Sequence, residues 1–194
     1  MKYRAAFALF AVASLSGCGI NSVPTAEENA KAKWADVQNY YQRRADLIPN
    51  LVATVKAAGA QEKSILVEVT QARASANQIK VTGADLTDPA KVAAYQQAQN
   101  GVTLSLQRLQ EAYPELKSQG NYTTLMSQLE GTENRIAIAR NDYNTAVQNY
   151  NTTIRTFPDA VGAKIFYGAK PMVPFQATTP GAETAPTVNF GNSN

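Results

Sequence analysis

A heptad repeat of apolar side chains near the end of the chain places the strongest constraint on its fold. An aromatic or aliphatic residue recurs at every seventh position over residues 122–157, and Val147 and Ile154 fill companion positions. This spacing forms one narrow apolar stripe on a helix, which must pack against other helices to be stable. The members of the repeat are Tyr122, Leu129, Ile136, Tyr143, Tyr150 and Phe157.

Three earlier segments carry stripes of the same kind. The first should begin at a capping box, Thr-Ala-Glu-Glu at 25–28, continue through Pro49 as a kinked helix and end at Gly59. The third should start with Asp88 as N-cap and Pro89 as first helical residue. The three stripes consist of Trp34, Val37, Tyr41, Arg44, Ile48, Leu51, Val55 and Ala58; of Ile65, Val69, Ala72, Ala76 and Ile79; and of Val92, Tyr95, Gln99, Val102, Leu106, Leu109, Tyr113 and Leu116.

Four such stripes joined by short connections predict an all-α fold, an antiparallel up-down four-helix bundle with long first and fourth helices. After Pro158 the periodicity ends and proline, threonine, alanine and glycine predominate, although Phe166, Tyr167 and Phe175 are candidates for docking on the bundle. We divide the chain into a signal peptide at 1–17, a tether at 18–24, the bundle at 25–158 and a partly disordered C-terminal extension at 159–194.

The N-terminus has the features of a bacterial export signal. Two basic residues precede an apolar run at 5–15, and Leu-Ser-Gly-Cys follows at 15–18. As a helix this run rises only ~17 Å, too little to cross a hydrocarbon core of ~30 Å. The tetrapeptide resembles the lipobox, which predicts that Cys18 carries a diacylglycerol and acyl chains such as palmitate. The alternative is a cytosolic helix that ends in a buried free cysteine.

Composition excludes several classes of function. Of 18 basic side chains, Lys2 and Arg4 belong to the export signal, and 15 acidic ones nearly balance the rest, so nothing favours nucleic acid as a partner. The chain has no histidine, the commonest general base and metal ligand. The sequence indicates no cofactor, no metal site and no catalytic residues.

Charged residues nevertheless fall on or beside two of the stripes and form a predicted structural polar seam of Arg44, Glu133 and Arg140. A buried charge needs a partner, so we expect Arg44 or Arg140 to pair with Glu133, Glu130 or Asp46 and to set helix register. Alternatively, these long side chains extend into solvent. A third interpretation makes Glu130 and Glu133 a metal-binding or acid–base pair.

Aromatic and amide side chains of the last segment have two interpretations each. Tyr122, Tyr143 and Tyr150 could line an aromatic ligand groove, but core tyrosines explain the same spacing. Asn144 and Asn151 fit surface positions or hydrogen bonds between helices.

Four ordered motifs identify a family resemblance. RRADLIPNLVATVK at 43–56, EAYPELKS at 111–118, LEGTENRIAIAR at 129–140 and YNTAVQNYNTTIRTFP at 143–158 resemble the LemA family. The resemblance implies a helical-bundle domain outside the cytoplasmic membrane, behind an N-terminal anchor, in a family without an established activity. This chain departs from that pattern because a lipobox stands where most members keep a transmembrane helix.

These observations predict a non-enzymatic envelope lipoprotein that serves as an interaction or scaffold module. Its partners would be the membrane, through Cys18, and an unidentified envelope or membrane protein. Gly19 after the cysteine favours the outer membrane, facing the periplasm, if the cell is Gram-negative. The alternatives are a small-ligand binder or enzyme with a pocket between helix ends, and a tail that tethers the protein to the cell wall.

Overall fold

The fold was analysed in a computed structural model, which describes residues 21–59 and 63–176. The predicted all-α class is confirmed, since these residues form helices and connecting segments without a strand. Cys18, the export signal and the end of the C-terminal extension lie outside the described residues.

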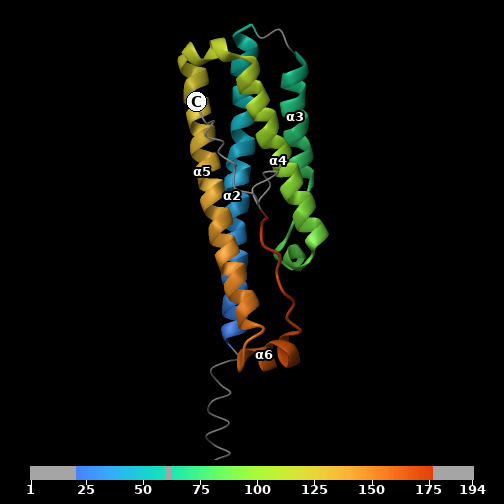
Figure 1. The fold of residues 1–194 in the computed structure, drawn as a ribbon. Coiled ribbons are helices and arrows are strands. Elements are labelled where there is room, and N and C mark those ends of the chain that lie inside the picture. The colour runs from blue at the N-terminus through green and yellow to red at the C-terminus, as the bar shows by residue number, and fades with distance from the viewer. Residues whose placement is uncertain (1–20, 60–62, 177–194) are drawn as a thin grey trace, which may run out of the picture.

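Four long helices dominate the described chain: α2 (Ser22–Ala57), α3 (Lys63–Gln78), α4 (Pro89–Ala112) and α5 (Gly120–Thr153). Consecutive helices run in opposite directions, and α2 and α5 extend well below α3 and α4 (Figure 1). Helix α2 packs chiefly on α5, and α3 packs chiefly on α4. The molecule is thus a long helix pair with a shorter pair covering its upper part.

Shorter helical elements join and close this arrangement. The 3-10 helices η1 (Gly83–Thr87) and η2 (Pro114–Ser118) flank α4. After α5, the short helix α6 (Asp159–Gly162) continues into η3 (Ala163–Tyr167), a π-helical turn that lies below the long pair. The sequence predicted a partly disordered extension after Pro158, whereas the structure has two short helical elements there.

The predicted start of the first helix is wrong. Helix α2 begins at Ser22, so residues 22–24 are its first turn and not part of a tether. Buried side chains form two clusters, a lower core around Trp34 and an upper core around Leu109. Val23 is fully buried in the lower core, and this contact extends the helix toward the N-terminus. The Thr25 hydroxyl therefore donates to the Asn21 carbonyl, 2.7 Å away, inside the helix instead of capping it.

Other predicted helix boundaries are confirmed. Helix α2 continues through Pro49, and Gly59 follows its end with a positive φ of 85°. Asp88 caps α4, because its carboxylate accepts hydrogen bonds from the backbone N–H groups of Ala90 and Lys91 at 2.9 and 3.3 Å. All eight predicted stripe positions of the third segment are buried.

The stripe of α5 is buried from Tyr122 to Tyr150, as predicted, but its last member is not. Phe157 is 85% exposed because α5 ends at Thr153, and beyond that point the helical period no longer determines where a side chain points. Of the three aromatic residues that were candidates for docking, only Phe175 is buried; Phe166 and Tyr167 are exposed.

An extended C-terminal strap, residues 168–176, covers the part of the long pair that α3 and α4 leave open. It runs back up from η3 toward α4 (Figure 1). Phe175 of the strap stacks on Trp34 at 5.5 Å between ring centroids, and Tyr143 and Tyr95 also pack on the indole ring at 5.3 and 5.2 Å. The indole N–H donates to the Val81 carbonyl at 3.1 Å. The strap thereby completes the lower core.

Replacing Phe175 should weaken the fold strongly, because this buried ring stacks on Trp34 and packs edge-on against Tyr143. We expect Phe175→Ala to lower the free energy of unfolding by about 3 to 5 kcal/mol. The matched control is Phe166→Ala, which removes an exposed ring and should change it by less than about 0.5 kcal/mol. Urea denaturation followed by circular dichroism measures both, and equal effects of the two variants would contradict docking of the strap.

Alkaline pH should destabilise the protein through its buried tyrosines. Burial raises the pKa of Tyr95 and Tyr143 above the ordinary value of about 10. Above that pH the unfolded chain loses these protons while the folded chain keeps them. Stability should therefore be unaffected below about pH 9 and fall above pH 10 by up to about 1.4 kcal/mol per pH unit for each such residue.

Urea denaturation at a series of pH values measures this loss. Tyr143→Phe should make the decline shallower, since one of the titrating groups is then absent. Tyrosinate absorbance that develops near pH 10 for all tyrosines, while the helical signal persists, would contradict the prediction.

Candidate functional site

The most deeply buried charge of the described chain is Arg44. It occupies a stripe position of α2 between Tyr41 and Ile48, and its side chain is only 2% exposed. Because both neighbouring stripe positions are buried, helical geometry turns the guanidinium into the bundle as well. Such a group is tolerated only when its hydrogen-bond donors find partners there.

Four hydrogen bonds satisfy the Arg44 guanidinium. Nη1 donates to Thr103 Oγ1 at 2.8 Å and to Glu133 Oε1 at 2.5 Å. Nη2 donates to the carbonyl oxygen and to Oε1 of Gln99, at 2.9 and 2.7 Å. We call Arg44, Gln99, Thr103 and Glu133 the arginine node; it joins α2, α4 and α5. The Arg44 guanidinium also lies over the Tyr41 ring, with its carbon 5.0 Å from the ring centroid.

The predicted polar seam is only partly brought together. Arg44 and Glu133 form an ion pair, whereas Glu130 lines a groove and Asp46 accepts a hydrogen bond from Gln42 at 2.7 Å. Arg140 lies elsewhere: it donates to the Gln176 carbonyl at 3.0 Å and sits over the Phe175 ring at 4.9 Å. Sequence spacing indicated which helix faces carry these residues. It could not determine which of the three candidate carboxylates pairs with Arg44.

The Glu133 carboxylate is already engaged, since it accepts from Arg44 and also from the Thr103 hydroxyl at 3.2 Å. Within 21–59 and 63–176, no group of three or more histidine, cysteine, aspartate or glutamate side chains is placed to hold a metal ion. The hydrogen bonds of the node join α2 to both α4 and α5.

A groove of about 370 Å³ runs between α4 and α5 beside the node. Apolar side chains form its floor, amide side chains stand on its rim, and two carboxylates lie along the α5 side. Its lining residues are Thr103, Leu106, Gln107, Gln110, Met126, Leu129, Glu130, Glu133 and Asn134. We call this feature the α4–α5 groove.

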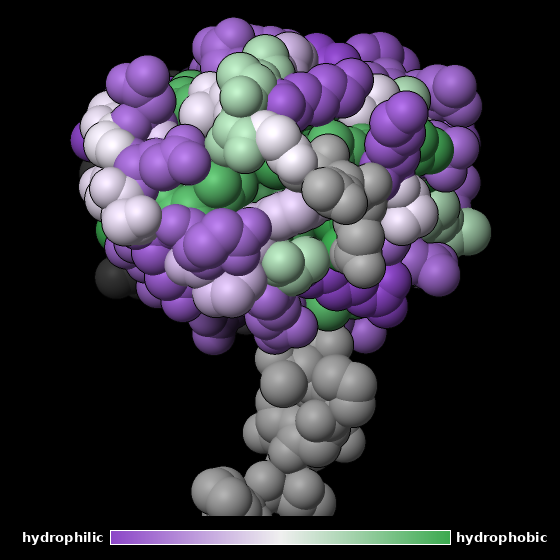
Figure 2. Space-filling model, turned by 90° about the horizontal axis from the view of Figure 1, so that it is seen from above, coloured by the Kyte–Doolittle hydropathy of each residue, from purple (hydrophilic) through white to green (hydrophobic). Residues whose placement is uncertain are grey.

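A second hollow, of about 670 Å³, lies between the end of α2 and the start of α5. Figure 2 looks onto this end, where polar side chains surround apolar surface. The hollow is lined by Ala53, Thr54, Ala57, Ala58, Gln119, Gly120 and Asn121. It has the location predicted for the alternative function, between helix ends, but no ionisable side chain lines it.

Side-chain amides hold the backbone of the strap. Asn144 accepts from the Phe175 N–H at 2.8 Å and donates to the Phe175 carbonyl at 3.0 Å. Asn151 makes the same pair of bonds with Met172, both at 2.8 Å. Gln96 does so with Gln176, at 3.3 and 2.6 Å. The two asparagines are seven residues apart, which indicated that they share one face of α5. This spacing did not reveal that they bind an extended strap and not another helix.

The three tyrosines of α5 are core residues. Tyr143 and Tyr150 belong to the lower core and Tyr122 to the upper one, each at most 2% exposed. The Tyr143 hydroxyl donates to the Val173 carbonyl of the strap at 2.9 Å. This burial supports the interpretation as packing residues over that of an aromatic ligand groove. No helix in the described ranges combines the length and apolar character that crossing a membrane requires.

Comparison with known proteins agrees with the four sequence motifs. The model of the LemA family matches residues 33–190. The chain is also 30% identical over 157 residues to the magnetosome proteins MamQ 1 and MamQ 2 of Paramagnetospirillum magneticum. These alignments cover 71% of this chain and 58% of each relative, so the chain spans a little over half of their length.

Arg44 and its neighbour Arg43 provide a matched test of the node, because Arg43 is exposed. We expect Arg44→Ala to lower the free energy of unfolding by about 3 to 5 kcal/mol, since it leaves the other members of the node without their partner. Arg43→Ala should change it by less than about 0.5 kcal/mol. Replacing both partners, Arg44→Met with Glu133→Leu, should restore part of the loss. Thermal and urea denaturation measure these differences, and equal effects at 43 and 44 would be incompatible with the node.

Proposed function

Because this chain belongs to the LemA family, we propose that it is a non-enzymatic interaction module, held at the outer face of a bacterial membrane by a lipid on Cys18. In a Gram-negative cell it would be attached to the outer membrane and face the periplasm. Its four helices would act as an up-down bundle that presents the α4–α5 groove to a partner protein of the envelope.

The α4–α5 groove is the observation that carries this proposal. It lies where the two helix pairs meet, since α2 packs on α5 and α3 packs on α4. Leu106, Met126 and Leu129 give it an apolar floor, and amides such as Gln107 stand on its rim. An apolar centre with a polar rim is the usual anatomy of a protein interface. Glu130 and Glu133 on one side favour a partner segment that carries a basic residue next to its apolar anchor.

The names of the relatives support the same class of function. Both are named as magnetosome proteins, after a cell structure and not after a reaction. For this chain we infer a comparable role as a component of a larger assembly, with partners of its own.

The small number of residues between Cys18 and Ser22 supports attachment close to the membrane. Helix α2 begins at Ser22, and the four residues from Cys18 to Ser22 span at most ~14 Å. A lipid on Cys18 would therefore keep the bundle at the bilayer surface.

Binding of a small ligand is the second candidate. Both the α4–α5 groove and the hollow between helix ends exceed ~300 Å³, the lower end of the range for ligand pockets. A screen of small molecules by thermal shift would support this candidate if a hit lost its effect in a variant of the hollow such as Ala57→Trp.

Loss of the lipid attachment site should release the protein from membranes. We expect Cys18→Ser to move the protein out of the fraction that extracts with detergent, because two or more acyl chains make attachment effectively permanent. Ser16→Ala, which keeps a small residue before the cysteine, is the control and should fractionate as the unaltered protein does. The anchoring model would be wrong if the Cys18→Ser protein still extracted with detergent like the unaltered protein.

Photocrosslinking in cells tests the groove. A photoreactive residue at Gln107, on the groove rim, should capture one envelope protein, and the same residue at Gln71, exposed on α3, should not. Met126→Glu places a charge on the groove floor and should abolish the capture at position 107. Equal capture from both positions, or capture that survives Met126→Glu, would mean that the groove is not the binding surface.

A further inference from the structure

The lower end of the bundle exposes large apolar side chains in an unusually short stretch of chain. Among the described residues, five of eight exposed large hydrophobic side chains lie between positions 157 and 167. We call these five the base face: Phe157, Val161, Ile165, Phe166 and Tyr167. Three of them are more than 60% exposed, although their size would favour burial. A cluster of this kind marks an interaction surface.

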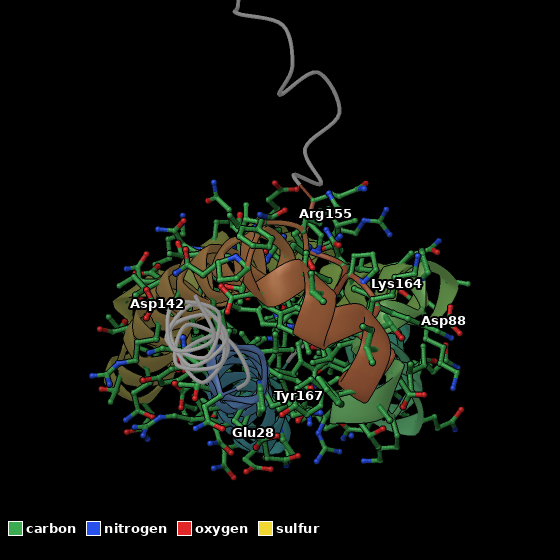
Figure 3. All side chains as sticks on the ribbon, turned by 90° about the horizontal axis from the view of Figure 1, so that it is seen from below. Glu28, Asp88, Asp142, Arg155, Lys164 and Tyr167 are labelled. Atoms are coloured by element: carbon green, nitrogen blue, oxygen red, sulfur yellow. The ribbon has the colours of Figure 1, made fainter. Side chains whose placement is uncertain are left out.

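The base face lies on the segment that closes the lower end of the bundle. Residues 157–167 include α6 and η3, which lie beneath the ends of α2 and α5 (Figure 1). Figure 3 looks onto this end and shows Tyr167 and Lys164 near the segment that crosses it. Ala163 and Gly162 are buried, so the segment packs one side on the bundle and turns its large side chains away from it.

Basic side chains accompany the base face. Arg155, Lys164 and Lys170 are exposed within or next to it. The acidic residue of the same stretch, Asp159, accepts a hydrogen bond from the Ser22 hydroxyl. Glu28, Asp88 and Asp142 lie around the outline of the bundle in the same view (Figure 3). Apolar side chains accompanied by lysine and arginine are typical of segments that lie in the surface of an anionic membrane.

The chain also enters the domain at this end. Ser22, the first residue of α2, contacts Asp159, the first residue of α6. Cys18 precedes Ser22 by four residues, so at most ~14 Å of extended chain separates the two residues. An anchor at Cys18 would therefore hold this end of the bundle, and not the end with the helix-end hollow, against the lipid.

We propose that the base face is a membrane-docking surface. Its apolar side chains enter the boundary between headgroups and acyl chains, while Arg155 and Lys164 contact anionic headgroups. The bundle then stands upright on the membrane, with the α4–α5 groove facing sideways along the surface. The proposal rests on the proposed anchoring at Cys18 and adds a defined orientation of the bundle, which a lipid anchor alone would not impose.

The test compares two exposed isoleucines. Ile165 is 68% exposed on the base face and Ile138 is 63% exposed on the side of α5. The acylated full-length protein is prepared as Ile165→Cys and, separately, as Ile138→Cys; each new thiol receives a nitroxide, since the lipid occupies the thiol of Cys18. Both proteins are reconstituted in vesicles of phosphatidylethanolamine and phosphatidylglycerol. Electron paramagnetic resonance then measures collisions with oxygen, which concentrates in lipid, and with a nickel complex, which stays in water.

We expect an oxygen-to-nickel accessibility ratio several-fold higher at position 165 than at 138. Phe166→Asp should lower the ratio at position 165, and Leu104→Asp, on the side of α4, should not. Equal, water-like ratios at both positions in vesicle-bound protein would overturn the docking surface while leaving the anchor intact. Protein that does not remain with the vesicles would instead refute the proposed anchoring.

The same experiment must also distinguish docking on lipid from binding of a second copy of the chain to the base face. In that case the label at position 165 would be shielded from oxygen and nickel alike, and the spectra would show spin–spin broadening. That result would overturn docking on lipid.

Discussion

The packing of α2 along α5 determines the rest of this structure. These helices have 36 and 34 residues, whereas α3 and α4 have 16 and 24, so the shorter pair cannot cover the full length of the longer one. Tyr95 of α4 covers the Trp34 indole only in part, and exposing large aromatic side chains such as Trp34 and Tyr143 to water would be costly. The strap covers the part that α3 and α4 leave open, and its Phe175 ring completes the lower core.

The arginine node holds the two helix pairs in register where the cores meet. One guanidinium bonds to Gln99 and Thr103 of α4 and to Glu133 of α5, so a shift of either helix by one turn would leave a charge buried without partners. The α4–α5 groove lies beside this point, and Thr103 and Glu133 of the node are among its lining residues.

The structure separates three surfaces that serve different purposes in our proposal. The base face and the start of α2 share the lower end, near the proposed lipid on Cys18. The α4–α5 groove lies on the side, where a neighbouring envelope protein could reach it. The strap is held through its backbone by Asn144, Asn151 and Gln96, which makes its position largely independent of its own side chains except Phe175 and Met172.

The sequence by itself determined what local periodicity and capping chemistry control. Heptad spacing identified the buried face of α5 from Tyr122 to Tyr150, and the Asp88-Pro89 pair identified the start of α4. Only tertiary structure decided where a helix stops, which of two similar phenylalanines is buried, and which carboxylate meets Arg44. Phe175 and Phe166 have the same chemistry in the same kind of segment, and only the space left between distant helices distinguishes them. Periodicity describes one helix at a time, whereas these choices depend on the surfaces that several helices leave uncovered together.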